Sequence, residues 1–253
     1  MSASSIEIRN LCKAFGNSSV VLEGVNLTIA DSEFVCLLGP SGCGKSTVLN
    51  IVAGFDFPTQ GEVLHDGRRI TLPEPRRAMI FQDVQGSLFG WLTIRQNVEF
   101  GPRMRGVAEP ERTQIVDRYI KLVGLADHAD YFPHQLSGGM KQRVQIARAL
   151  ANSPEVLLMD EPFGALDAQT RSTLQGELER IWRETKKTVL FITHDIGESI
   201  RLADRIVILS KGPRSHVSAI IKVDLPRPRA PGDGDFAGIY RQVEGLLHSL
   251  PPK

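Results

Sequence analysis

The first half of the chain alternates short apolar runs with turn residues. Apolar or alternating runs at 6–9, 20–29 and 33–38 predict strands, separated by turns at 16–17 and 31–32. A helix is expected at 45–53, a hairpin-like segment at 61–67 and a further strand at 78–81. This pattern predicts an amino-terminal β region followed by the start of an α/β core.

The second half of the chain changes to helical periodicity. Residues 83–152 read as helices, with a break at 133–135, and Val144, Ala147 and Leu150 mark one face of the last helix. Strands are then expected at 156–159, 189–193 and 206–209, with a helix at 169–184. Prolines and glycines between 226 and 234 predict an irregular stretch before a final helix at 236–250.

A glycine-rich loop follows the apolar run at 34–38. Gly39, Gly44, Lys45 and Ser46 have the spacing of a Walker A phosphate-binding loop. Backbone N–H groups and the start of the next helix can hold a triphosphate, Lys45 can reach its β and γ phosphates, and Ser46 can bind Mg²⁺. A plain glycine-rich turn would rarely reproduce four fixed positions.

Two carboxylates, Asp160 and Glu161, follow the apolar run at 156–159. Alone, this pattern is also typical of a buried strand that meets solvent. In an open α/β sheet, however, ligands bind beyond the carboxyl ends of the strands, near the phosphate loop. We expect Asp160 to serve Mg²⁺ through water and Glu161 to polarise an attacking water.

The sequence Leu-Ser-Gly-Gly-Met at 136–140 opens a predicted amphipathic helix. Ser137 could be only its N-cap. The two glycines that follow leave backbone N–H groups unobstructed, which would make a second anion site. Both interpretations hold for the sequence alone.

Residues 136–143 resemble the signature motif of ABC-type ATPases, and the resemblance covers nearly the whole chain. It implies an α/β fold. This fold would be a P-loop NTPase core of the ABC ATPase type with an amino-terminal antiparallel β region and an inserted helical subdomain. The implied organisation is a single domain at 1–253, with the helical subdomain at about 83–152 and a short carboxyl-terminal extension at about 212–253.

The resemblance also implies a set of site residues. Two copies would meet head to tail, with each signature helix closing on the γ phosphate held by the other copy. The implied catalytic residues are Glu161, His194 and Gln82, and the implied Mg²⁺ ligands are Ser46, Gln82 and Asp160. The implied ATP-binding residues are Phe15, Gly39, Pro40, Ser41, Gly42, Cys43, Gly44, Lys45, Ser46, Thr47, Ser137, Gly138, Gly139 and Asp167.

Three of these residues keep a simpler interpretation. Gln82 could mark only the exit of a strand, and His194 could be a surface residue at a turn. Phe15 resembles the aromatic residue that stacks on adenine, but it could equally belong to the core. Cys43 is expected to be a reactive thiol within the phosphate loop.

Within the family, residues 159–171, 91–93 and 224–229 resemble the nitrate, sulfonate and taurine importers, whereas 211–216 depart from that group's usual sequence. The region from Val84 to Trp91 corresponds to the seat of the permease's cytoplasmic coupling helix. Its apolar Leu88, Phe89 and Trp91 could also be helical core. The implied partners are a second copy, transmembrane permease subunits and, indirectly, an extracytoplasmic solute-binding protein.

Composition excludes several other classes. The 253 residues contain no apolar run long enough to span a bilayer, and residues 1–9 lack the features of a secretory signal. A net charge of +1 argues against a broad nucleic-acid surface. We expect a peripheral protein on the cytoplasmic face of the inner membrane. A non-transport ABC ATPase and a P-loop small-molecule kinase remain as alternatives.

Overall fold

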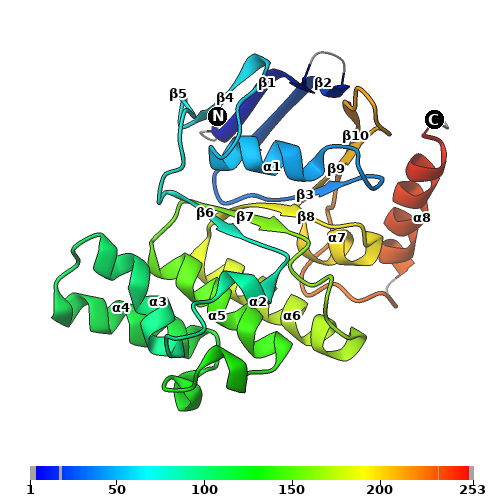
Figure 1. Ribbon diagram of the computed structural model, residues 1–253. Helices are drawn as coiled ribbons and strands as arrows, with labels where there is room; N and C mark the ends of the chain where they lie inside the picture. The colour runs from blue at the N-terminus through cyan, green and yellow to red at the C-terminus, as the bar shows by residue number, and fades with distance from the viewer. Residues whose placement is uncertain (1–3, 17–18, 233, 251–253) are drawn as a thin grey trace. The chain divides into compact units, whose positions relative to one another are not determined.

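The computed structural model describes residues 4–16, 19–232 and 234–250 (Figure 1). The chain forms two compact units. The first contains Met1–Glu74 and Lys186–Lys253, and the second contains Pro75–Thr185. The second unit is thus an insertion in the sequence of the first.

The first unit begins with an antiparallel sheet of order β2-β1-β4-β5. Its strands are β1 (Ser4–Phe15), β2 (Ser19–Ala30), β4 (Gln60–His65) and β5 (Arg68–Arg69). Along β2, Val25, Leu27 and Ile29 are buried and alternate with exposed residues, as expected for a strand with one covered face. The predicted amino-terminal antiparallel β region is confirmed.

The first unit also contains parallel strands. Strand β3 (Phe34–Leu38) pairs in parallel with both β8 (Thr188–Ile192) and β9 (Arg205–Leu209). Every residue of β3 and β8 is buried, which explains their unbroken apolar sequences. Helix α1 (Lys45–Ala53) has the predicted bounds and contacts β8.

The carboxyl-terminal part of the first unit is more regular than predicted. Strand β10 (Val217–Lys222), paired antiparallel with β9, and helix α7 (Ile196–Leu202) were both missed. Most of β10 is only half-buried or exposed, so its apolar signal is weak, and α7 has only seven residues. Helix α8 (Gly234–His248) contacts α7 and buries Phe236 and Val243.

The second unit contains the parallel strands β6 (Arg77–Ile80) and β7 (Val156–Asp160). Its helices are α2 (Val84–Ser87), α3 (Ile94–Met104), α4 (Glu109–Leu122), α5 (Gly138–Ala151) and α6 (Ala168–Thr185). Helices α3, α4 and α5 pack against one another. The predicted break at 133–135 is a 3₁₀ turn, η2 (Pro133–Gln135), and another, η1 (Ala126–His128), precedes it.

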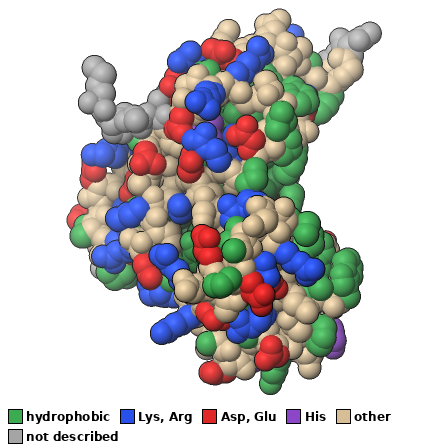
Figure 2. All heavy atoms as spheres, turned by 90° about the vertical axis from the view of Figure 1, so that its left-hand side faces the viewer, with side chains coloured by type: hydrophobic (Ala, Val, Ile, Leu, Met, Phe, Trp, Pro, Cys, Tyr) green, Lys and Arg blue, Asp and Glu red, His purple; other side chains and the backbone are tan. Residues whose placement is uncertain are grey.

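The α/β fold class is confirmed, while the assignment of 83–152 as a subdomain and of 212–253 as an extension stays a prediction. Among the described helices, none combines the length and the apolar character needed to cross a membrane. On the face shown in Figure 2, basic and acidic side chains are interspersed, in keeping with the net charge of +1.

Candidate nucleotide-binding site

The candidate residues lie in both units. Phe15, residues 39–47 and His194 belong to the first unit. Gln82, residues 137–139, Asp160, Glu161 and Asp167 belong to the second.

The phosphate loop connects β3 to α1 through a backbone that requires glycine. Gly42 and Gly44 have φ angles of 74° and 93°, in the left-handed region. A β-carbon at Gly44 would also lie 2.6 Å from Cδ2 of Leu22. Gly44 is the N-cap of α1, and no side chain caps this helix. The first N–H groups of α1 are therefore left for another acceptor, such as an anion.

Lys45 is held inside this loop. Its side chain is buried, and Nζ donates to the carbonyl oxygens of Gly39 at 2.8 Å and Pro40 at 3.0 Å. These bonds fix the ammonium group at the start of α1, where positive charge and the helix dipole act on the same point. Ser41 and Ser46 are exposed beside it, and Thr47 is half-buried. The loop therefore presents a cation and hydroxyl groups together.

The expectation that Cys43 is reactive is wrong. Its side chain is fully buried, and burial raises the pKa of the thiol despite an opposing effect of Lys45. Because the thiolate is the nucleophile, a raised pKa lowers reactivity at neutral pH. Cys43 fills space beneath the loop, where a β-carbon at Gly39 would meet its Sγ at 3.0 Å.

Strand register places His194 at the same edge as the phosphate loop. Leu37 pairs with Ile192 in the parallel strands β3 and β8, so Gly39 and His194 each follow two residues later. The His194 side chain is exposed. Next to it, Asp195 caps α7 by accepting from the Glu198 N–H at 2.9 Å.

Phe15 lies at the end of β1 and is 50% exposed, which excludes the core interpretation. Nζ of Lys13 lies 4.8 Å from the centre of its ring. Nζ is fixed by Asp56 Oδ1 at 2.5 Å and the carbonyl oxygen of Phe57 at 2.9 Å. The exposed ring is available for stacking, and its role with adenine stays a prediction.

In the second unit, strand register gathers Gln82, Asp160 and Glu161. Ile80 pairs with Met159 in the parallel strands β6 and β7, so the residues that follow both strands emerge at one edge. A β-carbon at Gly164 would lie 3.4 Å from Nε2 of Gln82 and 3.8 Å from Oε2 of Glu161. The two side chains therefore converge on Gly164.

The backbone of Glu161 has a φ of 41°, an uncommon conformation for a residue with a side chain. Such conformations cost on the order of 1–3 kcal/mol and cluster at functional sites. The carboxylate of Asp160 and the hydroxyl of Ser46 are hard oxygen donors of the kind that Mg²⁺ prefers. The donor set of the candidate residues therefore fits Mg²⁺.

Ser137 is the N-cap of α5, and its hydroxyl accepts from the Met140 N–H at 3.3 Å. A β-carbon at Gly139 would lie 2.8 Å from Cγ2 of Thr170 on α6. Asp167 accepts from the Thr170 N–H at 3.0 Å, and this bond lowers the pKa of its carboxyl group. The cap interpretation of Ser137 is confirmed, and binding of an anion there stays a prediction.

A cavity of about 430 Å³ lies among β6, α3 and α5 in the second unit. Its apolar lining includes Met79, Phe81, Phe89, Phe100 and Met104, and its basic lining includes Arg77, Arg105 and Arg148. Leu88 is buried core, Phe89 is half-buried, and Trp91 is 75% exposed. The core interpretation thus holds for Leu88 and fails for Trp91. The side chains of Val84 and Gln85 lie outside the described residues.

Asn97 was missed by sequence reasoning and fixes the loop beside this cavity. Its side chain is fully buried. The amide accepts from the Phe89 N–H at 3.0 Å and donates to the carbonyl oxygens of Phe89, Leu92 and Thr93 at 3.0–3.1 Å. In the sequence Asn97 lies within the mostly polar run Arg95–Glu99, so nothing local marked it as buried.

A sequence profile of the family described as "ABC transporter" matches residues 22–164. An uncharacterised ABC transporter ATP-binding protein of Methanocaldococcus jannaschii is 46% identical, over 96% of this chain and 91% of the relative.

Two cyanobacterial relatives are named for the solute of their transporter. The bicarbonate transport ATP-binding protein CmpC of Synechococcus elongatus is 49% identical, and the nitrate import ATP-binding protein NrtC of Synechocystis is 47% identical. Each match covers 88% of this chain and 34% of the relative.

Among solved structures, this chain is similar to the dimeric structure of an ATP-binding cassette in a post-hydrolysis state with ADP and Pi. The TM-score is 0.71 at 35% identity, over 87% of this chain and 100% of the other.

Proposed function

This chain belongs to the ABC transporter family as an ATP-hydrolysing subunit, and we propose that it energises a membrane importer for a small solute such as nitrate, sulfonate or taurine. The names of its relatives support a small anion, since one is a nitrate and another a bicarbonate transport protein. The subunit works on the cytoplasmic face of the inner membrane, and nucleic acid is not among its partners.

ATP binds first to the phosphate loop. The uncapped N-terminus of α1 and the loop N–H groups hold the phosphates, and Lys45 exchanges its carbonyl acceptors for β- and γ-phosphate oxygens. Phe15 stacks on adenine. Ser46, Asp160 and Gln82 would hold Mg²⁺, which would supply positive charge against the charge that develops on the phosphates.

Glu161 then orients and polarises the attacking water, with Gln82 beside it. Its fixed backbone conformation and its approach to Gly164 support this role, because a general base must be held within reach of the water. His194 contacts the γ phosphate. The placement of His194 and the phosphate loop at one strand edge carries this part of the proposal.

Two copies of the chain close around two nucleotides. Ser137, Gly138 and Gly139 of each copy contact the nucleotide held by the other copy, and Asp167 lies at the same interface. ATP favours the closed pair only to the extent that its affinity for the closed pair exceeds its affinity for the open pair. The similarity to a dimeric cassette supports this arrangement.

The permease subunits dock at the cavity beside Trp91, and the solute-binding protein acts through them. The exposed Trp91 and the apolar lining favour an amphipathic segment of the partner. Arg148 is largely buried against the Phe89 ring, and burial lowers its pKa. A partner segment that carries a carboxylate would offset that cost.

Co-purification tests the proposal. A tagged Glu161→Gln protein is extracted gently from native membranes with ATP present, and a permease with several membrane spans is expected to co-purify. Adding Trp91→Ala should remove the permease, whereas adding Phe57→Ala, which truncates another exposed aromatic residue, should not. Recovery of soluble partners alone would contradict a role in transport.

A further inference from the structure

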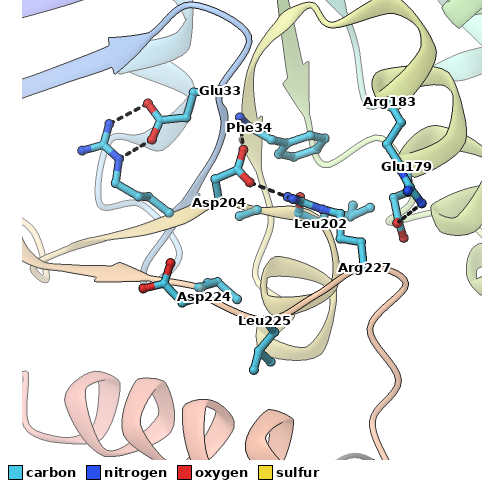
Figure 3. Close-up of polar contacts among 12 residues, drawn as sticks. Glu33, Phe34, Glu179, Arg183, Leu202, Asp204, Asp224, Leu225 and Arg227 are labelled. Atoms are coloured by element: carbon cyan, nitrogen blue, oxygen red, sulfur yellow. Dashed lines mark hydrogen bonds and ion pairs between the residues drawn. The ribbon is translucent and has the colours of Figure 1, made fainter. Parts of the chain in front are cut away.

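The segment between β10 and α8 contains two arginines, Arg227 and Arg229, that bind main-chain carbonyl groups of the first unit. Both guanidinium groups donate to carbonyl oxygens at the end of α7, and Figure 3 shows Arg227 beside Leu202 and Asp204. Arg229 is 4% exposed, and the side chain of Arg227 is 13% exposed. Buried charges are costly unless they are hydrogen-bonded, and the bonds of both guanidinium groups offset that cost.

Arg229 donates to four backbone carbonyl oxygens. Nη1 donates to the carbonyl oxygens of Ile200 at 2.7 Å and Ala203 at 2.6 Å. Nη2 donates to Val223 at 2.9 Å and Nε to Leu225 at 3.1 Å. One planar guanidinium group thus ties the carboxyl end of α7 to the segment that follows β10.

Arg227 extends the same connection to β3. It donates to the carbonyl oxygen of Leu202 at 2.7 Å and to Oδ1 of Asp204 at 2.8 Å. The other oxygen of Asp204 accepts from the Phe34 N–H at 2.9 Å (Figure 3). Phe34 is the first residue of β3, whose other end leads into the phosphate loop.

The last carbonyl groups of a helix have no partner within the helix and carry partial negative charge. In α7, which has only seven residues, the two arginines supply such partners at Ile200 and Leu202 and at the C-cap Ala203. A short helix has little stability of its own. Its position therefore depends on these external contacts.

The amino end of α7 is tied to His194. Asp195, the N-cap, donates its own N–H to Oγ1 of the buried Thr193 at 3.0 Å. His194 lies between these two residues. Any shift of α7 along its axis would move the backbone that carries the imidazole.

We propose that the segment Val223–Arg229 is a brace that fixes α7, and that Arg229 and Arg227 are positioning residues for His194 during ATP hydrolysis. The inference rests on the role of His194 in the proposed function. The brace contacts the end of α7 and, through Asp204, the start of β3, and the opposite ends of these two elements carry His194 and the phosphate loop.

Charges around Cys36, in the middle of β3, agree with this arrangement. Burial raises the pKa of the Cys36 thiol, the nearby Glu198 of α7 raises it further, and Arg227 and Arg229 lower it. Groups from α7 and from the brace therefore both act on this residue of β3.

The test compares Arg229→Met with Arg229→Lys and with Arg241→Gln, an exposed arginine on α8. Steady-state ATP hydrolysis, equilibrium binding of a fluorescent ATP analogue with Mg²⁺, and the NMR titration of the His194 imidazole are measured on the full chain. Arg229→Met should lower kcat about tenfold, keep nucleotide affinity within about twofold and shift the His194 resonances. Arg229→Lys should have an intermediate effect, and Arg241→Gln none.

Three results would overturn the inference: unchanged kcat in Arg229→Met, a lower kcat with unchanged His194 resonances, or equal losses of kcat and nucleotide binding. If Arg229→Met does not fold, Arg227→Gln replaces it, with the same pattern and a smaller loss expected. His194→Ala distinguishes the role of the imidazole from the role of the brace. Full activity in His194→Ala refutes the role of the imidazole, whereas the NMR shift in Arg229→Met tests the brace itself.

Discussion

Two helices of this chain begin at glycine-rich loops, and they satisfy their first N–H groups in different ways. Helix α1 has the left-handed Gly44 as its N-cap and no capping side chain, with the Lys45 ammonium held beside it. Helix α5 has Ser137 as its N-cap, which accepts from the Met140 N–H.

The difference indicates that the two helix starts have different roles in nucleotide binding. The start of α1 combines a cation with uncapped N–H groups, so it can bind a triphosphate within one copy of the chain. The start of α5 is already capped, and it has no such cation built into its loop among the described contacts. It can therefore contribute to phosphate binding, but we expect it to do so only on a nucleotide that another copy already holds.

Of the variants that test this difference, removal of the Lys45 ammonium group should have the largest effect. Lys45→Ala is expected to weaken ATP binding about a hundredfold, because contacts to charged groups contribute about 1.5–3 kcal/mol each. Calorimetric titration measures the affinity, and Lys222→Ala, which removes an exposed lysine of β10, is the control. Equal affinities for the Lys45→Ala and control proteins would refute the assignment of the phosphate loop.

The two loops should also differ in their tolerance of a β-carbon. In Gly44→Ala the new β-carbon lies 2.6 Å from Leu22 at a residue with a φ of 93°, so the free energy of unfolding should fall by about 2 kcal/mol. In Gly138→Ala the new β-carbon lies 3.3 Å from Leu166 at a helical position, so the free energy of unfolding should change by less than about 1 kcal/mol. Urea unfolding measures both variants, and equal losses would contradict the stated difference between the loops.

Ser137 allows the cap to be separated from the anion site. Ser137→Ala should lower the free energy of unfolding by about 1 kcal/mol, whereas Ser137→Asp keeps a good N-cap and should cost little. A carboxylate repels phosphate, so Ser137→Asp should nevertheless lose more ATP hydrolysis than Ser137→Ala. Parallel unfolding and hydrolysis measurements decide between the roles: if hydrolysis follows stability in both variants, Ser137 is only a cap.

Local sequence predicted the parts of the molecule that depend on local rules. The bounds of α1, the strands that flank it and the cap of α5 follow from glycine positions, apolar runs and an N-cap serine. The antiparallel β region followed from alternation, since β2 has one covered face. The family motifs named the residues that the strand registers then brought to common edges, such as Gln82 and Glu161.

Features that depend on distant partners were missed. Arg227 and Arg229 appeared in the sequence as part of a proline-rich tail, because the α7 carbonyl groups that they bind are more than twenty residues away. Cys43 was expected to be reactive because sequence shows its neighbours and not its burial. Helix α7 is too short to show a helical period, and it is held by the same arginines.

The central claim is that the two helix starts act on one nucleotide from different copies. Light scattering with Mg²⁺ and ATP tests it on Glu161→Gln, which should bind ATP, hydrolyse it at least a hundredfold more slowly and accumulate as a dimer. Adding Ser137→Asp should leave nucleotide affinity unchanged and return the protein to a monomer. A dimer that persists in the double variant, or a Glu161→Gln protein that stays monomeric with ATP bound, would contradict the account.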